Sequence, residues 1–378
     1  MAGRLASRLW TLTQLLKPSS WFRPAPHSPP RRILVLHHLL LGDTLMLTPL
    51  LAKLRAQYAD TEICLACPSA FLSLYAAQPF GVIAVPFDPR KVSTLKKLSQ
   101  RGPWDLCIIP AENRYTPLAR ALGAQRIVGF AGDRPGWKNL LLDEAAGFPA
   151  APACFGDFVA SELIPGTPPR HFSPEDWPWA QAESFSRPRQ PYVVLHLGAS
   201  SPLKYWPTAR WMALAEWFSI QGFEIVWSAG AKETGLVDQV DAERRFTDLA
   251  GKLDLLQLAT LLADAALMVC PDTGVAHLGR LTGTPTIALF GPGSPAICGA
   301  GDYWRNSPFV ALSAEVSCRD QSTTFRRNAA WIRRCARSHG DGAGQCARPL
   351  CMEGIPLQAV QAAARSLLAG QPDTRVQG

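Results

Sequence analysis

The chain has 378 residues, of which 47% are hydrophobic and 18% are charged, and its net charge is +8. At roughly 150 residues per domain, this length predicts about two domains. The composition is typical of a globular protein, which excludes a largely disordered, collagen-like or coiled-coil chain.

Most of the positive charge lies at the N-terminus. Residues 1–32 contain six basic residues and no acidic residue, which leaves a net charge of only +2 for residues 33–378. A nearly neutral body argues against a nucleic-acid-binding protein, so we expect no nucleic-acid partner. A basic leader on such a body favours an anionic membrane surface, although the segment also resembles an organellar transit peptide.

Residues 1–30 form this basic leader. Leu5, Leu9, Leu12 and Leu16 recur at helical spacing, which favours a short interfacial helix. A disordered tail is the alternative. No apolar run reaches the roughly 20 residues that a membrane-spanning helix requires.

The first half of the chain alternates apolar runs with amphipathic stretches, which is typical of a parallel sheet covered by helices. The expected strands are residues 33–36, 63–66, 82–85, 106–109 and 126–130. The expected helices are residues 45–57 and 72–77. Seven prolines in residues 165–191 then indicate a linker.

The same alternation resumes after the linker. The expected strands are residues 192–197, 223–228, 266–270 and 286–290. The expected helices are residues 208–221, 255–263, 275–282 and 356–369. The pattern therefore predicts two Rossmann-like halves with a cleft between them, and ligands in such sheets bind beyond the carboxyl ends of the strands.

Several common nucleotide and metal motifs are missing. The chain has no G-x-G-x-x-G after a strand, no P-loop, and no H-E-x-x-H or paired C-x-x-C pattern. A dinucleotide-dependent dehydrogenase, a P-loop enzyme and a common zinc site are therefore not expected.

The first polar segment that follows a strand is Gly42-Asp43-Thr44. Asp43 lies where a general base would face the cleft, but an aspartate is also favoured there as a helix cap. The helix N-terminus lowers the pKa of such a carboxyl group and keeps it ionised, so that it can accept a proton during a reaction.

A second segment, residues 198–207, runs from a strand into a loop of small residues. Ser200 and Ser201 offer hydroxyl groups, and Lys204 adds a positive charge. This combination suits a loop that holds a phosphorylated ligand. An ordinary loop with a surface lysine is the alternative.

The third segment, residues 271–277, leads from a strand into a helix. Thr273 and Gly274 can present backbone N–H groups at the helix N-terminus, where a diphosphate is favoured. Asp272 can accept hydrogen bonds from sugar hydroxyls or cap the helix. His277 can donate to an anion or simply pack in the core.

In their order, these segments resemble the ADP-heptose:lipopolysaccharide heptosyltransferases, glycosyltransferase family 9, over residues 31–368. The matching motifs are Gly42-Asp43 with Thr48-Pro49, residues 198–207, Leu249-Ala250-Gly251-Lys252, Asp272-Thr273-Gly274-x-x-His277, Gly283-Thr284-Pro285 and Phe290-Gly291-Pro292. This chain departs from the family pattern at His37, at Ser228-Ala229-Gly230 and at Arg280-Leu281.

The resemblance implies an α/β fold of GT-B architecture, with two Rossmann-like domains facing a central cleft. The implied parts are a leader (1–30), an N-terminal acceptor domain (31–165), a linker (166–190), a C-terminal donor-binding domain (191–356) with an Arg/Cys-rich insertion (315–351), and a C-terminal helix and tail (357–378).

The implied activity is an inverting, metal-independent transfer of heptose from ADP-heptose to a lipid-linked core oligosaccharide, without a cofactor. Asp43 is implied as the base and Lys204 as the diphosphate-binding residue. The implied donor-binding residues are Ser200, Ser201, Glu233, Asp272, Thr273, Gly274 and His277. The implied location is cytoplasmic, peripheral at the inner membrane.

Three alternatives remain open at this point. A family member can use another nucleotide sugar or an acceptor outside lipopolysaccharide. A GT-B-like nucleotide-sugar epimerase would turn over the donor without an acceptor. A degenerate binding module would be unaffected by loss of Asp43.

The chain has ten cysteines, too few for a disulfide scaffold at this length, and most are expected in the core. Cys318, Cys335, Cys346 and Cys351 belong to the insertion, and their spacing is irregular for a zinc site. A structural metal site and free thiols both remain open there. Residues 315–349 hold seven arginines and three acidic residues, so this insertion can also face a phosphorylated lipid.

Overall fold

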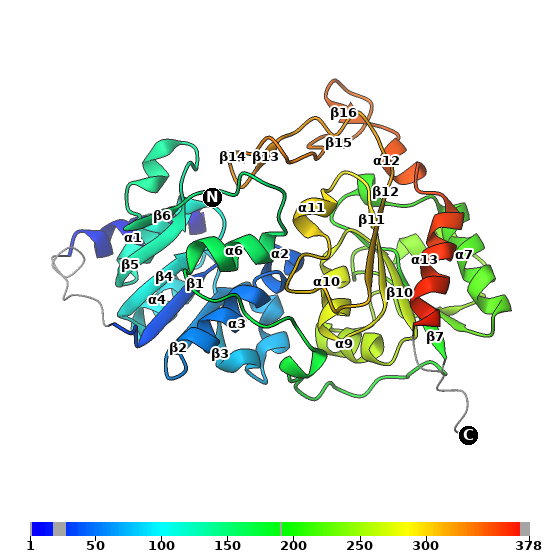
Figure 1. Cartoon of the computed structure of the whole chain (residues 1–378), viewed down its shortest axis with the longest axis horizontal. Coiled ribbons are helices and arrows are strands. Elements are labelled where there is room, and N and C mark those ends of the chain that lie inside the picture. Colours follow the sequence, from blue (N-terminus) through cyan, green and yellow to red (C-terminus); the bar gives the residue numbers. More distant parts are fainter. Residues whose placement is uncertain (1, 18–27, 190, 371–378) are drawn as a thin grey trace. The chain divides into compact units, whose positions relative to one another are not determined.

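The computed structural model describes residues 2–17, 28–189 and 191–370, and the chain divides into two compact units (Figure 1). Unit 1 comprises Met1–Arg170, Pro178–Ala180 and Ser322–Ile332. Unit 2 comprises His171–Trp177, Gln181–Gln321 and Arg333–Gly378. Residues 322–332 therefore pack with unit 1, although they follow most of unit 2 in the sequence.

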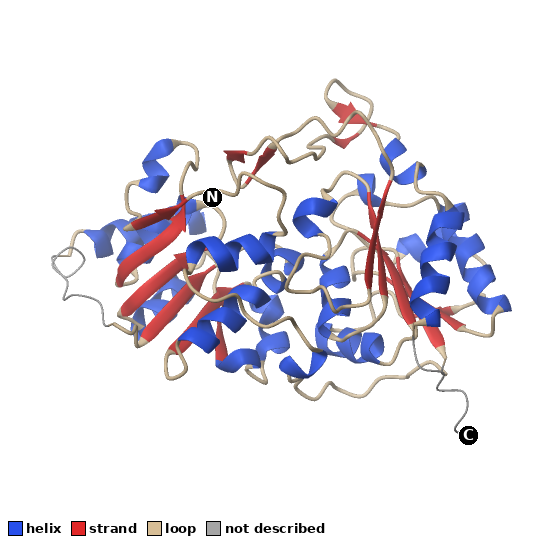
Figure 2. Cartoon of the chain, viewed as in Figure 1, coloured by secondary structure: helices blue, strands red, loops and turns tan. Residues whose placement is uncertain are grey.

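Unit 1 contains a parallel six-stranded sheet in the order β3-β2-β1-β4-β5-β6 (Figure 2). Its strands are β1 (Arg32–Leu36), β2 (Glu62–Cys67), β3 (Val82–Pro86), β4 (Trp104–Ile109), β5 (Ala124–Phe130) and β6 (Glu144–Ala146). Most side chains of β1, β2 and β4 are buried, as expected for a parallel sheet covered on both faces.

The α-helices of unit 1 are α1 (Ala2–Leu15), α2 (Leu41–Leu45), α3 (Thr48–Gln57), α4 (Val92–Arg101), α5 (Thr116–Ala121) and α6 (Phe155–Leu163). The single helix expected over residues 45–57 is thus divided into α2 and α3. The division falls before Pro49, which occupies the first turn of α3, where a proline needs no backbone N–H. The helical stretch expected over 72–77 is a 3₁₀ helix, Ser69–Tyr75.

Unit 2 repeats this architecture, with a parallel six-stranded sheet in the order β12-β11-β10-β7-β8-β9. Its strands are β7 (Tyr192–His196), β8 (Glu224–Ser228), β9 (Thr247–Asp248), β10 (Leu267–Pro271), β11 (Thr286–Phe290) and β12 (Phe309–Ser313). Its α-helices are α7 (Thr208–Ile220), α8 (Gly235–Val240), α9 (Leu255–Ala263), α10 (Gly274–Leu281), α11 (Pro295–Cys298), α12 (Leu350–Glu353) and α13 (Leu357–Ala369).

The strand order of each sheet reverses at one point. In unit 1 this point lies between β1 and β4, and in unit 2 it lies between β7 and β10. At such a point the two adjacent loops run in opposite directions, and ligands of open α/β sheets bind there. The fold therefore directs attention to the loops that follow these four strands.

Two short two-stranded sheets interrupt the insertion. The strands β13 (Thr323–Thr324) and β14 (Arg327–Asn328) pair antiparallel, and they lie within the part of the insertion that belongs to unit 1. The strands β15 (Ser338–His339) and β16 (Gln345–Cys346) pair in unit 2. We call residues 322–332 the arm.

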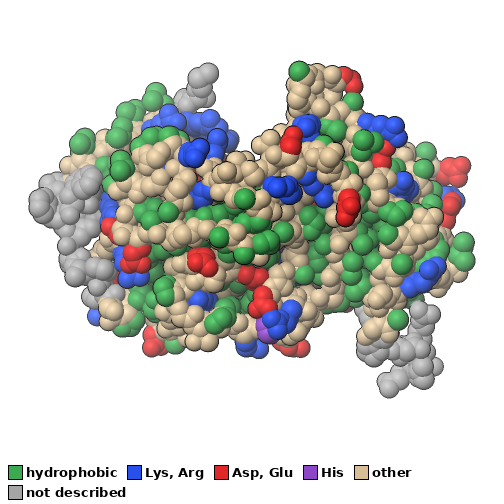
Figure 3. All heavy atoms as spheres, turned by 45° about the horizontal axis from the view of Figure 1, so that its top comes forward, with side chains coloured by type: hydrophobic (Ala, Val, Ile, Leu, Met, Phe, Trp, Pro, Cys, Tyr) green, Lys and Arg blue, Asp and Glu red, His purple; other side chains and the backbone are tan. Residues whose placement is uncertain are grey.

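The surface shows no uniform charge. On the face in Figure 3, acidic and basic side chains alternate with hydrophobic ones, and Lys and Arg side chains gather at the upper edge of the part drawn from unit 1. No helix in the described ranges has the length and apolar character needed to cross a membrane.

Candidate functional site

An ion pair connects the two central loops of unit 2. Lys204, at the end of the short 3₁₀ helix Pro202–Lys204, donates to the Asp272 carboxylate at 2.9 Å and to the Asp272 carbonyl at 2.7 Å. Both side chains are largely buried. The lysine of the loop after β7 and the aspartate after β10 are therefore brought together at the reversal point of the sheet.

The loop after β11 packs tightly against this ion pair. A Cβ atom added to Gly293 would lie 2.2 Å from Oδ2 of Asp272, so a side chain at this position would displace the carboxylate. Gly293 thus leaves the space that the Asp272 carboxylate occupies when it pairs with Lys204.

The N-terminus of α10 lies directly after Asp272. Thr273 is the N-cap residue, and its side chain makes no capping hydrogen bond within the described part of the chain. Asp272 therefore engages Lys204 and does not occupy the N-cap. The N–H groups at Thr273 and Gly274 belong to the first turn of an eight-residue helix, the position that favours a diphosphate.

His277 is buried on the first turn of α10. Burial lowers its pKa well below the usual value, and the nearby cations Arg280 and Lys204 lower it further. A neutral imidazole carries one N–H group, so His277 can donate a single hydrogen bond at neutral pH.

Glu233 braces the loop after β7. Its Oε1 accepts hydrogen bonds from the backbone N–H of Ala199 at 2.9 Å and from the Tyr205 hydroxyl at 3.3 Å. Its Oε2 lies against the backbone of Gly198, where an added Cβ would come within 2.4 Å. The carboxylate thus holds the loop that carries Lys204.

The two serines of this loop differ in their surroundings. Ser200 is exposed. The Ser201 hydroxyl accepts from the backbone N–H of Leu203 at 3.3 Å and caps the 3₁₀ helix that positions Lys204. Ser200 is therefore the more exposed of the two.

The insertion also contacts the same end of unit 2, a feature that the sequence did not indicate. Arg319 donates to the carbonyls of Phe290 and Gly291, both at 2.8 Å, and the backbone N–H of Cys335 donates to the carbonyl of Pro292 at 2.9 Å. The insertion therefore fixes the loop after β11, which in turn positions Asp272.

The cysteines of the insertion do not form a cluster of metal ligands. Cys318 and Cys335 are partly exposed, and Arg337 donates to the carbonyl of Cys318 at 2.7 Å. No group of three or more His, Cys, Asp or Glu side chains suited to a metal occurs in residues 2–17, 28–189 and 191–370.

In unit 1, Asp43 lies in the first turn of α2, directly after the loop that follows β1. Its Oδ2 accepts from the backbone N–H of Leu40 at 3.2 Å, in a capping-box arrangement. The residue is partly exposed. The capping role and the general-base role considered from the sequence are compatible, because the residue accepts the capping hydrogen bond and is still partly exposed.

A hollow lies beside this loop, at the reversal point between β1 and β4. The residues that line it are Leu36, His37, His38, Leu39, Ile109, Ala111, Glu112, Arg114 and Tyr115. Burial lowers the pKa of His37 to about 3, and its Nε2 has no hydrogen-bond partner among the described residues. Glu112, Arg114 and Tyr115 were not singled out from the sequence, because separate polar residues after a strand carry no distinctive motif.

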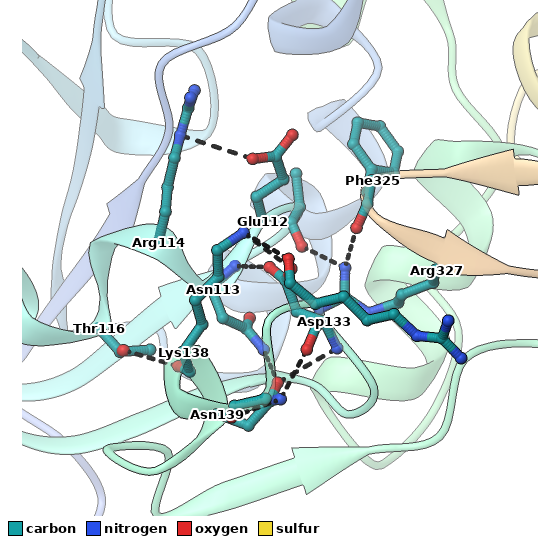
Figure 4. A network of polar contacts seen from close by, with 12 residues as sticks. Glu112, Asn113, Arg114, Thr116, Asp133, Lys138, Asn139, Phe325 and Arg327 are labelled. Carbon is teal, nitrogen blue, oxygen red and sulfur yellow. Dashed lines mark hydrogen bonds and ion pairs between the residues drawn. The ribbon is translucent and has the colours of Figure 1, made fainter.

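The arm contributes Arg327 to a network of polar contacts that also contains Glu112 and Asp133 (Figure 4). Arg327 is buried and donates to the carbonyls of Ala111 at 2.8 Å, Phe130 at 2.8 Å and Ala131 at 2.7 Å. Asp133 accepts from the backbone N–H of Asn113 at 2.6 Å. The segment that begins at Ala111 is therefore fixed by a side chain that enters from the arm.

Comparisons with known proteins bear on both units. Residues 168–326 match the family model described as glycosyltransferase family 9 (heptosyltransferase). Lipooligosaccharide heptosyltransferase 2 of Haemophilus ducreyi is 26% identical over 305 residues, which cover 70% of this chain and 84% of that protein. Both matches support the resemblance to glycosyltransferase family 9 that the sequence motifs indicated. The chain is a glycosyltransferase, as the resemblance implied.

Other heptosyltransferases are similar over different lengths. Lipopolysaccharide heptosyltransferase 1 of Pseudomonas aeruginosa is 33% identical over 133 residues, but the match spans only 36% of that protein. The structure of ADP-heptose lps heptosyltransferase II from E. coli superimposes with a TM-score of 0.66 at 18% identity, covering 89% of this chain and 98% of that one. The α/β class and the GT-B architecture implied by the sequence resemblance are therefore confirmed.

Proposed function

We propose that this glycosyltransferase transfers heptose from ADP-heptose to a lipopolysaccharide core acceptor, either lipid A–Kdo or a heptose residue already attached. The names of its relatives support the lipopolysaccharide acceptor. The observation that carries the donor assignment is the Lys204–Asp272 pair at the N-terminus of α10.

In this proposal the donor diphosphate binds at the N-terminus of α10. The N–H groups of Thr273 and Gly274 and the ammonium of Lys204 stabilise the ADP as its negative charge grows during bond cleavage. Lys204 has three N–H donors, so it can bind a phosphate oxygen while it keeps a hydrogen bond to Asp272. These groups provide positive charge without a metal ion.

The proposed reaction is a single displacement. The oxygen of the acceptor hydroxyl attacks the anomeric carbon, the bond to the diphosphate breaks, and the hydroxyl proton passes to the carboxylate of Asp43. One displacement inverts the anomeric configuration. His277, Glu233 and the serines at 200 and 201 complete the donor site in this proposal.

The proposed location is the cytoplasmic face of the inner membrane, with the enzyme bound at the surface. A lipid-linked acceptor favours such a location, because the enzyme then meets its substrate in two dimensions. The basic leader favours an anionic lipid surface.

A thermal-shift panel tests the donor assignment. ADP-, UDP-, GDP- and CMP-linked sugars, including ADP-heptose, are added to the purified full chain, since a ligand at about 100 times its Kd adds about 2.7 kcal/mol of stability. We expect selective stabilisation by ADP-heptose that is weakened in Lys204→Ala and Asp272→Ala. Lys97→Ala, which removes an exposed lysine of α4, is the matched control and should respond as the parent does.

Two results would contradict this function. A response to UDP- or GDP-sugars would keep the fold and the family but replace the donor. No response to any member of the panel would favour a binding module in place of an enzyme.

A further inference from the structure

The leader helix α1 packs on the rest of unit 1 through a face that is poor in large apolar side chains. It contacts α4 and α5, and Trp10 packs against the apolar core on that side of the sheet. Ser7 is 3% exposed, and a Cβ added to Gly3 would lie 2.7 Å from the carbonyl oxygen of Arg90. The inward face of α1 therefore consists of small and polar residues together with one tryptophan.

The leucines of the same helix point the other way. Leu5, Leu9, Leu12 and Leu16 are 62%, 54%, 56% and 82% exposed. At about 100° per residue these four positions fall within an arc of about 60°, opposite Ser7. A surface helix normally turns its apolar stripe toward the core, so α1 is inverted relative to that rule.

Positive charge borders this leucine stripe. Arg4 and Arg8 are exposed next to it, and Lys17 follows the helix. The two helices that pack against α1 contain no acidic residue, and α4 adds the exposed Lys96 and Lys97. Apolar side chains flanked by cations match the boundary of an anionic bilayer, where acyl chains lie beneath phosphate groups.

We propose that the outward face of α1 is a docking surface for an anionic lipid bilayer, with the leucines inserted and the basic residues at the headgroups. This docking surface would hold the enzyme at the membrane that carries its acceptor. The inference rests on the proposed function, because that function supplies the lipid-linked acceptor. The helix lies in the plane of the interface, because its 14 residues extend about 21 Å, less than the roughly 30 Å hydrocarbon layer.

The charge pattern favours a bilayer over a second copy of the chain. Two copies that met through this stripe would bring Arg4 and Arg8 of each copy together without an acidic partner on α1, α4 or α5. An anionic bilayer instead supplies the opposite charge. Dimerisation through the leucines is therefore an outcome that the test must detect.

The test measures co-sedimentation of the full chain with phosphatidylcholine vesicles, with or without about one third phosphatidylglycerol. We expect binding to the anionic vesicles alone. Replacing Leu5, Leu9 and Leu12 by serine should weaken binding by about 1,000-fold, at roughly tenfold per leucine side chain lost from the apolar layer. Ile220→Ser is the matched control, because Ile220 is 87% exposed in unit 2 and should leave binding unchanged.

A second pair of variants tests the charge. Arg4→Gln with Arg8→Gln should weaken binding about 20- to 30-fold, at about 1 kcal/mol per cation, and Arg4→Lys with Arg8→Lys should preserve it. Circular dichroism and the melting temperature check that each variant is folded, as expected for changes at exposed positions.

Several outcomes would overturn the proposal. These are equal binding to both kinds of vesicle, no binding to either kind, and a leucine variant that binds as Ile220→Ser does. Leucine-dependent dimers without vesicle binding would assign the stripe to a second copy. Turnover of a water-soluble acceptor fragment tests the proposed function without a membrane. The leucine variants should retain this turnover even when they no longer bind vesicles. Loss of that turnover together with vesicle binding would mean that α1 serves the fold, and would also overturn the proposal.

Discussion

Arg327→Met removes the guanidinium that joins the arm to the rest of unit 1. In the structure this guanidinium donates four hydrogen bonds to backbone carbonyls. Three acceptors follow or end strands of unit 1, and they are Ala111, Phe130 and Ala131. The fourth acceptor is Phe325 in the arm itself. Burial lowers the pKa of Arg327, and the carboxylates of Asp133 and Glu112 oppose that shift. Methionine fills a similar length but cannot donate to these carbonyls, of which Phe130 keeps a second donor, the side-chain amide of Asn113.

The expected cost follows from these contacts. Hydrogen bonds to a charged group contribute about 1.5–3 kcal/mol each, but bonds that share one group are not additive. Removing one partner of a buried charged network typically costs about 3–5 kcal/mol. We therefore expect Arg327→Met to lower the free energy of local opening around Ala111 and Phe130 by that amount.

Hydrogen exchange followed by mass spectrometry measures this opening. At about 1.4 kcal/mol per factor of ten, exchange in the peptides that span residues 111–116 and 130–139 should accelerate between about 10² and about 10⁴-fold. Arg326→Met is the matched control, since Arg326 is exposed and adjacent. If both variants accelerate exchange equally, or by less than about fivefold, the buried guanidinium does not hold the arm in the way we describe.

Three further predictions concern unit 2. Gly198→Ala should raise the donor KM in steady-state assays, because its Cβ would come within 2.4 Å of Oε2 of Glu233 and shift the loop that carries the lysine; an unchanged KM would contradict this role. Gly293→Ala should displace Asp272, whose Oδ2 lies 2.2 Å from the added Cβ, and should therefore reduce stabilisation by the donor in the thermal-shift assay. Gly235→Ala is the control and should reduce it less, because an added Cβ at Gly235 meets open space. Burial lowers the pKa of His196 to about 4, so the unfolded chain binds its proton first as the pH falls. The contribution of neutral His196 to stability is therefore present above about pH 6.5. It is lost as the pH falls toward 4, by up to about 1.4 kcal/mol per pH unit. In urea unfolding, the stability of His196→Gln should depend less steeply on pH than that of the parent.

The sequence was most informative where buried strands meet loops of small residues. The apolar run of residues 255–263 coincides with α9, and the segments that end at Lys204 and begin at Asp272 lie on neighbouring strands. Parallel strands align their carboxyl ends, so two such loops come together whenever their strands pair. This is why the alternation of strands and loops could predict that these segments lie at one edge of a sheet, whereas the roles of their residues came from the family resemblance.

Other elements carried no such signal. The helix α4 buries only Leu95 and Leu98 among its ten residues, so its apolar periodicity is too short to stand out. The arm was interpreted as part of a basic surface insertion, yet Arg327 is 3% exposed. Any residue provides a carbonyl oxygen, so the sequence does not indicate which residues an arginine will bind through their backbone. The burial of such an arginine depends on which distant segment of the chain it contacts.

The position of the arm in the chain has a consequence for synthesis on the ribosome. The sheet of unit 1 is complete once Ala146 has been made, but the residues of the arm follow roughly 150 residues after Arg170. At about 5–20 residues per second, unit 1 waits about 10–30 s for them. During that interval the carbonyls of Ala111, Phe130 and Ala131 lack the hydrogen bonds from Arg327. The N-terminal half of the nascent chain therefore reaches its final packing only after most of the C-terminal half has left the ribosome.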